Sequence, residues 1–95
     1  AHSLALYCRE IRYFVQPAHI LDGSAKVPDN LFDCRMACIT AVAIMDSSNW
    51  ETVLNYIEKL PAEIQSLACR AAARKSTLKD LCLSRRWNKW VVANS

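Results

Sequence analysis

Apolar residues recur along this chain at the three- and four-residue spacing that is typical of amphipathic α-helices. The first such stripe consists of Leu4, Tyr7, Cys8 and Ile11. The spacing predicts five helices, over residues 3–15, 31–45, 50–60, 61–74 and 77–92. Residues 18–30 contain turn-forming clusters and are expected to be a connection with one short apolar turn.

Polar residues at the expected helix starts predict how these helices are capped. Asp29 or Asn30 can cap the helix over 31–45. The segments 48–51 and 77–80 each begin with Ser or Thr and end with an acid, so we predict two capping boxes. Pro61 fits the first position of the next helix, where a missing N–H costs nothing.

The segment 31–45 is apolar nearly all round over its second half, which predicts the central and most buried helix. We therefore expect an all-α fold, a single compact bundle of four to five helices formed by residues 1–95. The predicted core residues are Cys38, Val42, Trp50, Val53, Leu54, Ile57, Ile64, Leu67 and Leu81.

Composition supports this expectation and excludes several classes of protein. Hydrophobic residues make up 53% and charged residues 22% of the chain, which argues against disorder. A single Gly and 3 Pro argue against a many-stranded sandwich and against a glycine-rich nucleotide loop. The longest apolar run, 36–45, is about half the length of a membrane-spanning helix. We expect a cytoplasmic protein without membrane contact, cofactor or small-molecule substrate.

The 5 cysteines are expected to be reduced and structural, because their number is odd and no CxxC pair occurs. Cys34 and Cys38 lie one helical turn apart and could form half of a zinc site, but no second close pair completes it. Cys8 with His19 lacks a context that activates a thiol. We therefore predict neither a metal site nor catalysis.

Charge is distributed unevenly along the chain. Residues 1–66 have 5 basic and 8 acidic side chains, 5 − 8 = −3, whereas residues 67–95 have 7 basic and 1 acidic, 7 − 1 = +6. On one continuous helix, Lys79, Arg86 and Lys89 would share a stripe. Such a stripe can contact phosphates while a tryptophan stacks on a base. The candidate residues for binding an anionic partner are Lys75, Lys79, Arg85, Arg86, Lys89 and Trp90.

Two other interpretations of the C-terminal half stay open. Residues 71–90 could form a helix-turn-helix with its turn near Lys75 and Ser76, although the usual turn glycine is absent. Trp87 and Trp90 could belong to the core, because large aromatic side chains are usually buried.

We expect a small non-catalytic module whose basic C-terminal helix contacts an anionic partner, DNA or RNA in the first place. The alternative is a protein-interaction module, for which the Ala-rich helix over 61–74 and the apolar connection Ala18–Leu21 could present a docking surface. The segments Trp50–Leu54, Leu60–Glu63 and Trp90–Val91 are similar to the helical region that follows the ATPase core in some AAA+ proteins. This resemblance covers under half of the chain and implies a lid-like accessory domain that lacks Walker residues.

Overall fold

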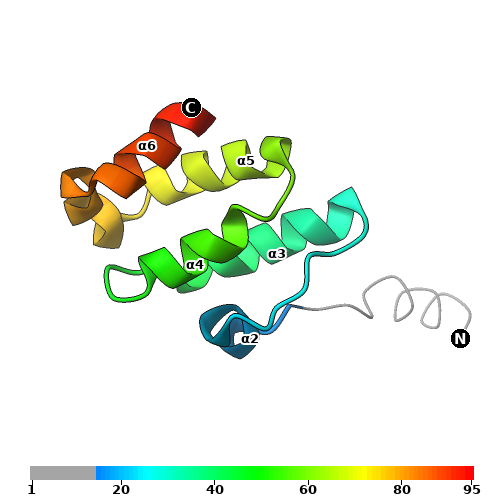
Figure 1. Cartoon of the computed structure of the whole chain (residues 1–95). Coiled ribbons are helices and arrows are strands. Elements are labelled where there is room, and N and C mark those ends of the chain that lie inside the picture. The colour runs from blue at the N-terminus through cyan, green and yellow to red at the C-terminus, as the bar shows by residue number, and fades with distance from the viewer. Residues whose placement is uncertain (1–14) are drawn as a thin grey trace, which may run out of the picture.

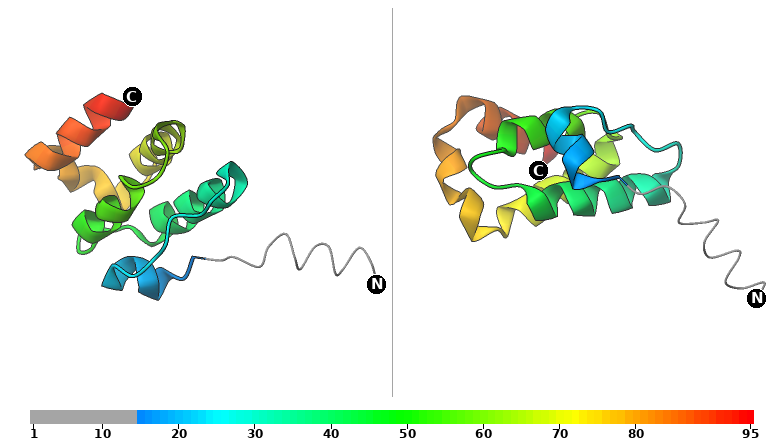
Figure 2. Two further views of the ribbon diagram at one scale, coloured as in Figure 1. Left: turned by 45° about the vertical axis from the view of Figure 1, so that its right-hand side comes forward. Right: turned by 90° about the horizontal axis from the view of Figure 1, so that it is seen from below.

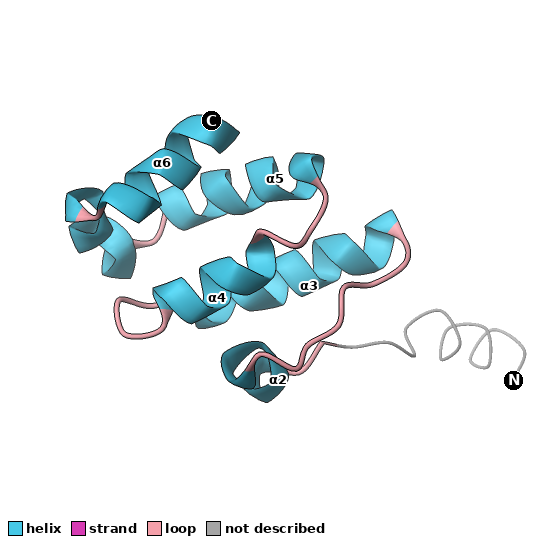
Figure 3. Cartoon of the chain, in the orientation of Figure 1, coloured by secondary structure: helices cyan, strands magenta, loops and turns pink. Residues whose placement is uncertain are grey.

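Residues 15–95, which a computed structural model describes, contain helices and no strand (Figure 1, Figure 3). The expected all-α fold is confirmed. The helix expected over residues 3–15 lies, except for Val15, outside the described residues. The elements are α2 (Pro17–Asp22), α3 (Leu31–Ile44), α4 (Trp50–Ile57), α5 (Ala62–Ala73), the 3₁₀-helix η1 (Ser76–Leu83) and α6 (Arg85–Asn94).

Helix α3 packs against α2, α4 and α5, so it is central to the helix packing, as predicted. Helix α6 packs on α5 and η1 at the other side of the molecule, and α2 lies across α3 and α4 (Figure 1, Figure 2). The prediction that α3 is also the most buried helix is wrong, since five of its 14 residues are buried, against four of the 8 in α4. Phe32 and Ile39 each expose 61% of their surface, because no described element covers that side of the helix.

The core is formed by apolar side chains from every described helix. Seven of the nine predicted core residues are fully buried, whereas Trp50 and Leu67 are partly buried at its edge. The seven are Cys38, Val42, Val53, Leu54, Ile57, Ile64 and Leu81. Within residues 15–95, no helix is both long enough and apolar enough to cross a bilayer.

The caps follow the predictions in part. Asn30 caps α3, since its Oδ1 accepts a hydrogen bond from the Asp33 backbone N–H at 2.8 Å. The capping box predicted over 48–51 does not form, because Ser48 bonds back to Asp46 within the preceding turn and Asn49 occupies the cap position.

Two element boundaries also differ from the predictions. Pro61 stands one residue before α5 rather than inside it. The turn expected near Ala18 is the six-residue helix α2, which ends at Gly23 with a φ of 84°. A positive φ of this size favours glycine, so Gly23 allows the chain to leave the helix.

The continuous helix predicted over 77–92 is wrong, because the chain divides into η1 and α6 at Ser84. Ser84 is extended, with φ −89° and ψ 128°, and its Oγ caps α6 by accepting from the Trp87 N–H at 3.3 Å. The second predicted capping box, over 77–80, is absent as well.

The break has a physical cause in the apolar pattern. On one straight helix at about 100° per residue, Leu78 and Leu81 would lie opposite Trp87 and Trp90. All four side chains are buried, which requires the chain to change direction between Leu81 and Trp87.

Candidate nucleic-acid interface

The six candidate residues for anion binding do not form one stripe, because they lie on both sides of the break at Ser84. Lys75 precedes η1 and Lys79 lies within it, whereas the other four belong to α6. Three of the six are exposed and have no partner within residues 15–95, and the other three have a role inside the protein.

Lys75 binds the C-terminal end of α3. Its Nζ donates hydrogen bonds to the backbone carbonyls of Val42 at 2.7 Å, Ala43 at 3.0 Å and Met45 at 2.9 Å. These carbonyls carry the partial negative charge of a helix C-terminus, where further helix would supply N–H partners. The Val42 carbonyl also accepts a hydrogen bond from the Met45 backbone N–H at 3.3 Å. The ammonium group therefore joins the end of α5 to the end of α3.

Arg86 turns toward α4 and not toward solvent. Its Nη2 donates to Glu58 Oε1 at 2.9 Å and to Asn55 Oδ1 at 2.6 Å, and its Nη1 lies 4.0 Å from Glu51. The guanidinium carbon also lies 5.9 Å from the centre of the Trp50 ring, within the range of a cation–π contact. Arg86 makes the only salt bridges found within residues 15–95.

Trp90 is a core residue and not a stacking platform. It exposes 4% of its surface, and its indole N–H donates to Gln65 Oε1 at 3.1 Å. The Trp87 ring lies 5.4 Å from the Trp90 ring and 5.8 Å from the Trp50 ring. This aromatic cluster holds α6 against α5 and α4, so the interpretation of both tryptophans as core residues is confirmed.

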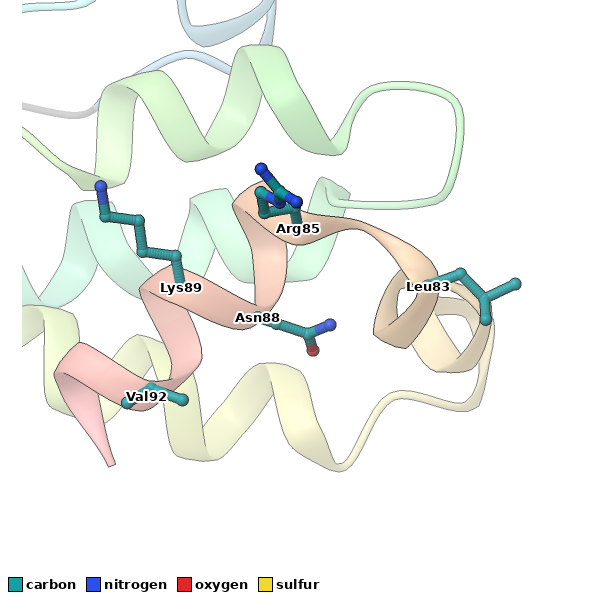
Figure 4. Close-up of a pocket in the computed structure, with 5 residues that line it drawn as sticks. All are labelled: Leu83, Arg85, Asn88, Lys89 and Val92. Atoms are coloured by element: carbon teal, nitrogen blue, oxygen red, sulfur yellow. The ribbon is translucent and has the colours of Figure 1, made fainter.

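Lys79, Arg85 and Lys89 are exposed, and none of them has a salt bridge or side-chain hydrogen bond within residues 15–95. Arg85 and Lys89 project from the same side of α6 beside an open depression of about 600 Å³ (Figure 4). Its other lining residues are Leu83, Asn88 and Val92. Asn88 is held in place, since its Nδ2 donates to the Cys82 carbonyl at 2.6 Å.

The helix-turn-helix interpretation is wrong. It requires two α-helices joined by a short turn near Lys75 and Ser76. The chain instead continues from α5 into the 3₁₀-helix η1, and the next α-helix begins only at Arg85.

The described cysteines have the surroundings of core residues, apart from Cys82, which is exposed. Cys34 and Cys38 both face the interior, and burial raises the pKa of the Cys38 thiol to about 11 against a smaller lowering by Arg35. Within residues 15–95, no three His, Cys, Asp or Glu side chains gather closely enough to hold a metal ion. His19 lies exposed on α2, and Cys8 lies outside the described residues.

Helices α3 and α5 form an apolar surface, here called the α3/α5 surface, of which the sequence predicted only the α5 part as a candidate docking surface. On α3 it consists of Phe32, Met36, Ile39 and Ala43, and on α5 of Leu67 and Ala71. A pocket of about 390 Å³ lies between the two helices. The four α3 residues lie within about 60° of one another on a helical wheel, and this spacing was the available signal.

Comparisons of the chain with protein-family models, with curated proteins and with solved structures find no match.

Proposed function

We propose that this chain is a non-catalytic binding module that contacts DNA or RNA phosphates through Lys79, Arg85 and Lys89. The observation that carries the proposal is that all three cations are exposed and unpaired within the described residues. By contrast, Arg86, which shares α6 with Arg85 and Lys89, is paired with Glu51 of α4 and with Glu58 at the end of that helix. Exposed cations without an acidic partner are available to replace the counterions that surround phosphates.

The surroundings of the three cations also favour an anionic partner. No acidic residue occurs in α6, and Asp80 is the single acid between residues 67 and 95. Each phosphate contact to a duplex contributes about −0.9 to the slope of log K against log salt. Three contacts therefore predict a slope of about −2.7. The arrangement includes no base-reading helix, so we expect little dependence on nucleotide sequence.

The test compares two triple variants that change the net charge equally. In the first, Lys79, Arg85 and Lys89 are replaced by Glu, and in the second Lys59, Arg70 and Arg74 are replaced by Glu. Binding of a labelled duplex and a labelled single strand is measured by fluorescence anisotropy between about 50 and 200 mM salt. We expect the first variant to lose binding and the second to keep it, with unchanged far-UV circular dichroism in both.

Two results would contradict the proposal. One is a parent chain that binds neither nucleic acid at about 50 mM salt. The other is an equal loss of binding in both triple variants, because this would indicate a response to net charge alone. Binding of an acidic protein by the same three cations, without nucleic-acid binding, would favour the alternative in which the basic end meets a protein.

A second candidate function is an accessory helical domain of a larger assembly, as the resemblance to AAA+ helical regions implies. The specific observation that favours it is the α3/α5 surface, because apolar patches of this kind mark protein contacts. Co-purification of a protein with the parent chain, and its loss in an Ile39→Asp variant, is the result expected for this function.

A further inference from the structure

The α3/α5 surface has an apolar centre and a basic border. We propose that it binds an amphipathic helix whose apolar stripe is flanked by acidic residues. The proposal rests on the second candidate function and adds the chemistry of the partner.

The shape of the surface favours a helical partner. Phe32, Met36, Ile39 and Ala43 follow one another along about 16 Å of α3, at roughly 1.5 Å per residue. Ile39 and Ala43 border the pocket of about 390 Å³, and Leu67 and Ala71 of α5 form its opposite wall. A third helix can lay an apolar stripe along such a groove. The described residues offer no sheet edge to which an extended peptide could add a strand.

Arginines border the apolar centre on both helices. Arg35 lines the pocket from α3. On α5, Arg70 follows Leu67 by three positions and Arg74 follows Ala71 by three, so each arginine is a surface neighbour of a groove residue. All three are exposed and have no salt bridge within residues 15–95. Two acids also lie beside the surface, namely Glu63, one turn before Leu67 on α5, and Asp33, three positions before Met36 on α3 and hydrogen-bonded to Asn30. The three arginines therefore leave the border with a net positive charge.

This charge distribution discriminates between three possible occupants. A second copy of the chain would place the same arginines opposite one another. The segment before Val15 contains Arg9, Glu10 and Arg12, so it also brings net positive charge. Of the three occupants, only a partner helix with acidic flanks can pair with all three arginines while its apolar stripe covers Phe32 and Ile39. Opposite charges at such an interface determine which partner is accepted.

The experiment uses two synthetic fluorescein-labelled peptides on the full chain. Both have leucines at helical spacing, and one has Glu and the other Lys at every flanking position. Fluorescence anisotropy is expected to show binding of the Glu peptide at least about tenfold tighter than that of the Lys peptide, a difference of about 1.4 kcal/mol. Changing Arg35, Arg70 and Arg74 together to Glu should reverse this order.

Ile39→Asp should weaken binding of the Glu peptide at least about tenfold, which corresponds to about 1.4 kcal/mol. Leu21→Asp, an equally apolar-to-acidic change at a side chain with 45% exposure on α2, should leave binding of the Glu peptide unchanged. Circular dichroism and thermal melting verify that each variant is folded. Should Ile39→Asp unfold, the triple arginine variant tests the proposal alone, since its three positions are exposed.

Other outcomes would overturn the proposal in distinguishable ways. Tighter binding of the Lys peptide would contradict the acidic flanks of the partner but would still support docking at the α3/α5 surface. Binding of neither peptide would contradict both the acidic flanks and the docking function. A dimer in sedimentation that Ile39→Asp dissociates would identify a second copy as the occupant. If the Glu peptide bound only to a variant with both Leu4→Asp and Ile11→Asp, the occupant would be the chain's own first residues, because these two changes would release them from the surface. The nucleic-acid proposal stands apart, because its three cations lie outside this surface.

Discussion

Replacing Lys75 by Met should destabilise the domain although Lys75 looks like one of several surface cations in the sequence. Methionine keeps most of the aliphatic stem and removes the ammonium group. The carbonyls of Val42, Ala43 and Met45 then lose a donor that now lies 2.7 to 3.0 Å from them. The effect is therefore on folding, whereas a phosphate-binding lysine would affect only affinity.

The expected loss of unfolding free energy is about 2 kcal/mol. A hydrogen bond to a charged group contributes about 1.5–3 kcal/mol. A cation at a helix C-terminus contributes about 0.3–1 kcal/mol. The three bonds share one ammonium, and Lys75 is only partly buried, so their contributions do not add in full. For a domain of this size, about 2 kcal/mol corresponds to a melting temperature about 8–16 °C lower.

The assay is thermal and urea unfolding followed by far-UV circular dichroism, with Lys79→Met as the matched control. Lys79 is exposed without a partner, so its replacement should change stability by no more than about 0.5 kcal/mol. Equal stability of the two variants would refute the reasoning. A loss of nucleic-acid binding by Lys75→Met without any loss of stability would refute it too, and would return Lys75 to the interface.

Three further predictions concern the aromatic cluster, the thiols and the acid dependence. Trp50→Ala should cost about 3 kcal/mol in urea unfolding, because it removes an edge-on contact with Trp87; a cost below about 1 kcal/mol would contradict this packing. Iodoacetamide at pH 8 should label Cys82 first and Cys38 only after unfolding, by mass spectrometry; early labelling at Cys38 would contradict its burial. Hydrogen bonds from Ser48 lower the pKa of Asp46 in the folded protein from its ordinary value of 3.8. The ionised carboxylate therefore stabilises the fold above pH 3.8, and this stabilisation is lost as the pH falls through the lower pKa of the folded state. Asp46→Asn should therefore lose less stability than the parent between about pH 4 and pH 2, and an unchanged acid dependence would contradict this contribution.

The sequence predicts the helices wherever one apolar face is sufficient to define them. Helix α4 has such a face, and its Val53, Leu54 and Ile57 are buried as expected. At α3 the apolar pattern does not predict which side lacks a neighbour, because the second half of the helix is apolar nearly all round. At residues 77–92 it predicts one helix, although a single straight helix cannot bring Leu78 and Trp87 into the same core.

The candidate site was predictable only in part, since the fate of a cation depends on distant residues. Lys75 bonds to carbonyls 30 to 33 positions earlier in the chain, and Arg86 pairs with Glu58 at the end of α4. No local pattern encodes such partners. The exposed positions of Arg85 and Lys89 could be predicted, because they follow from their spacing against the buried Trp87 and Trp90 on one short helix.

The break at Ser84 has a consequence for the order in which the domain opens. Helix α6 follows a single extended residue and packs mainly on α5 and η1, so it can separate while α2, α3 and α4 keep their shared contacts. Local opening of this kind is visible in native-state hydrogen exchange as a unit of low protection. Arg85 and Lys89 lie on that unit, and a ligand that binds only its docked form stabilises it by mass action. Binding at these cations should therefore slow amide exchange in α6 selectively, while the amides of α3 keep their exchange rates.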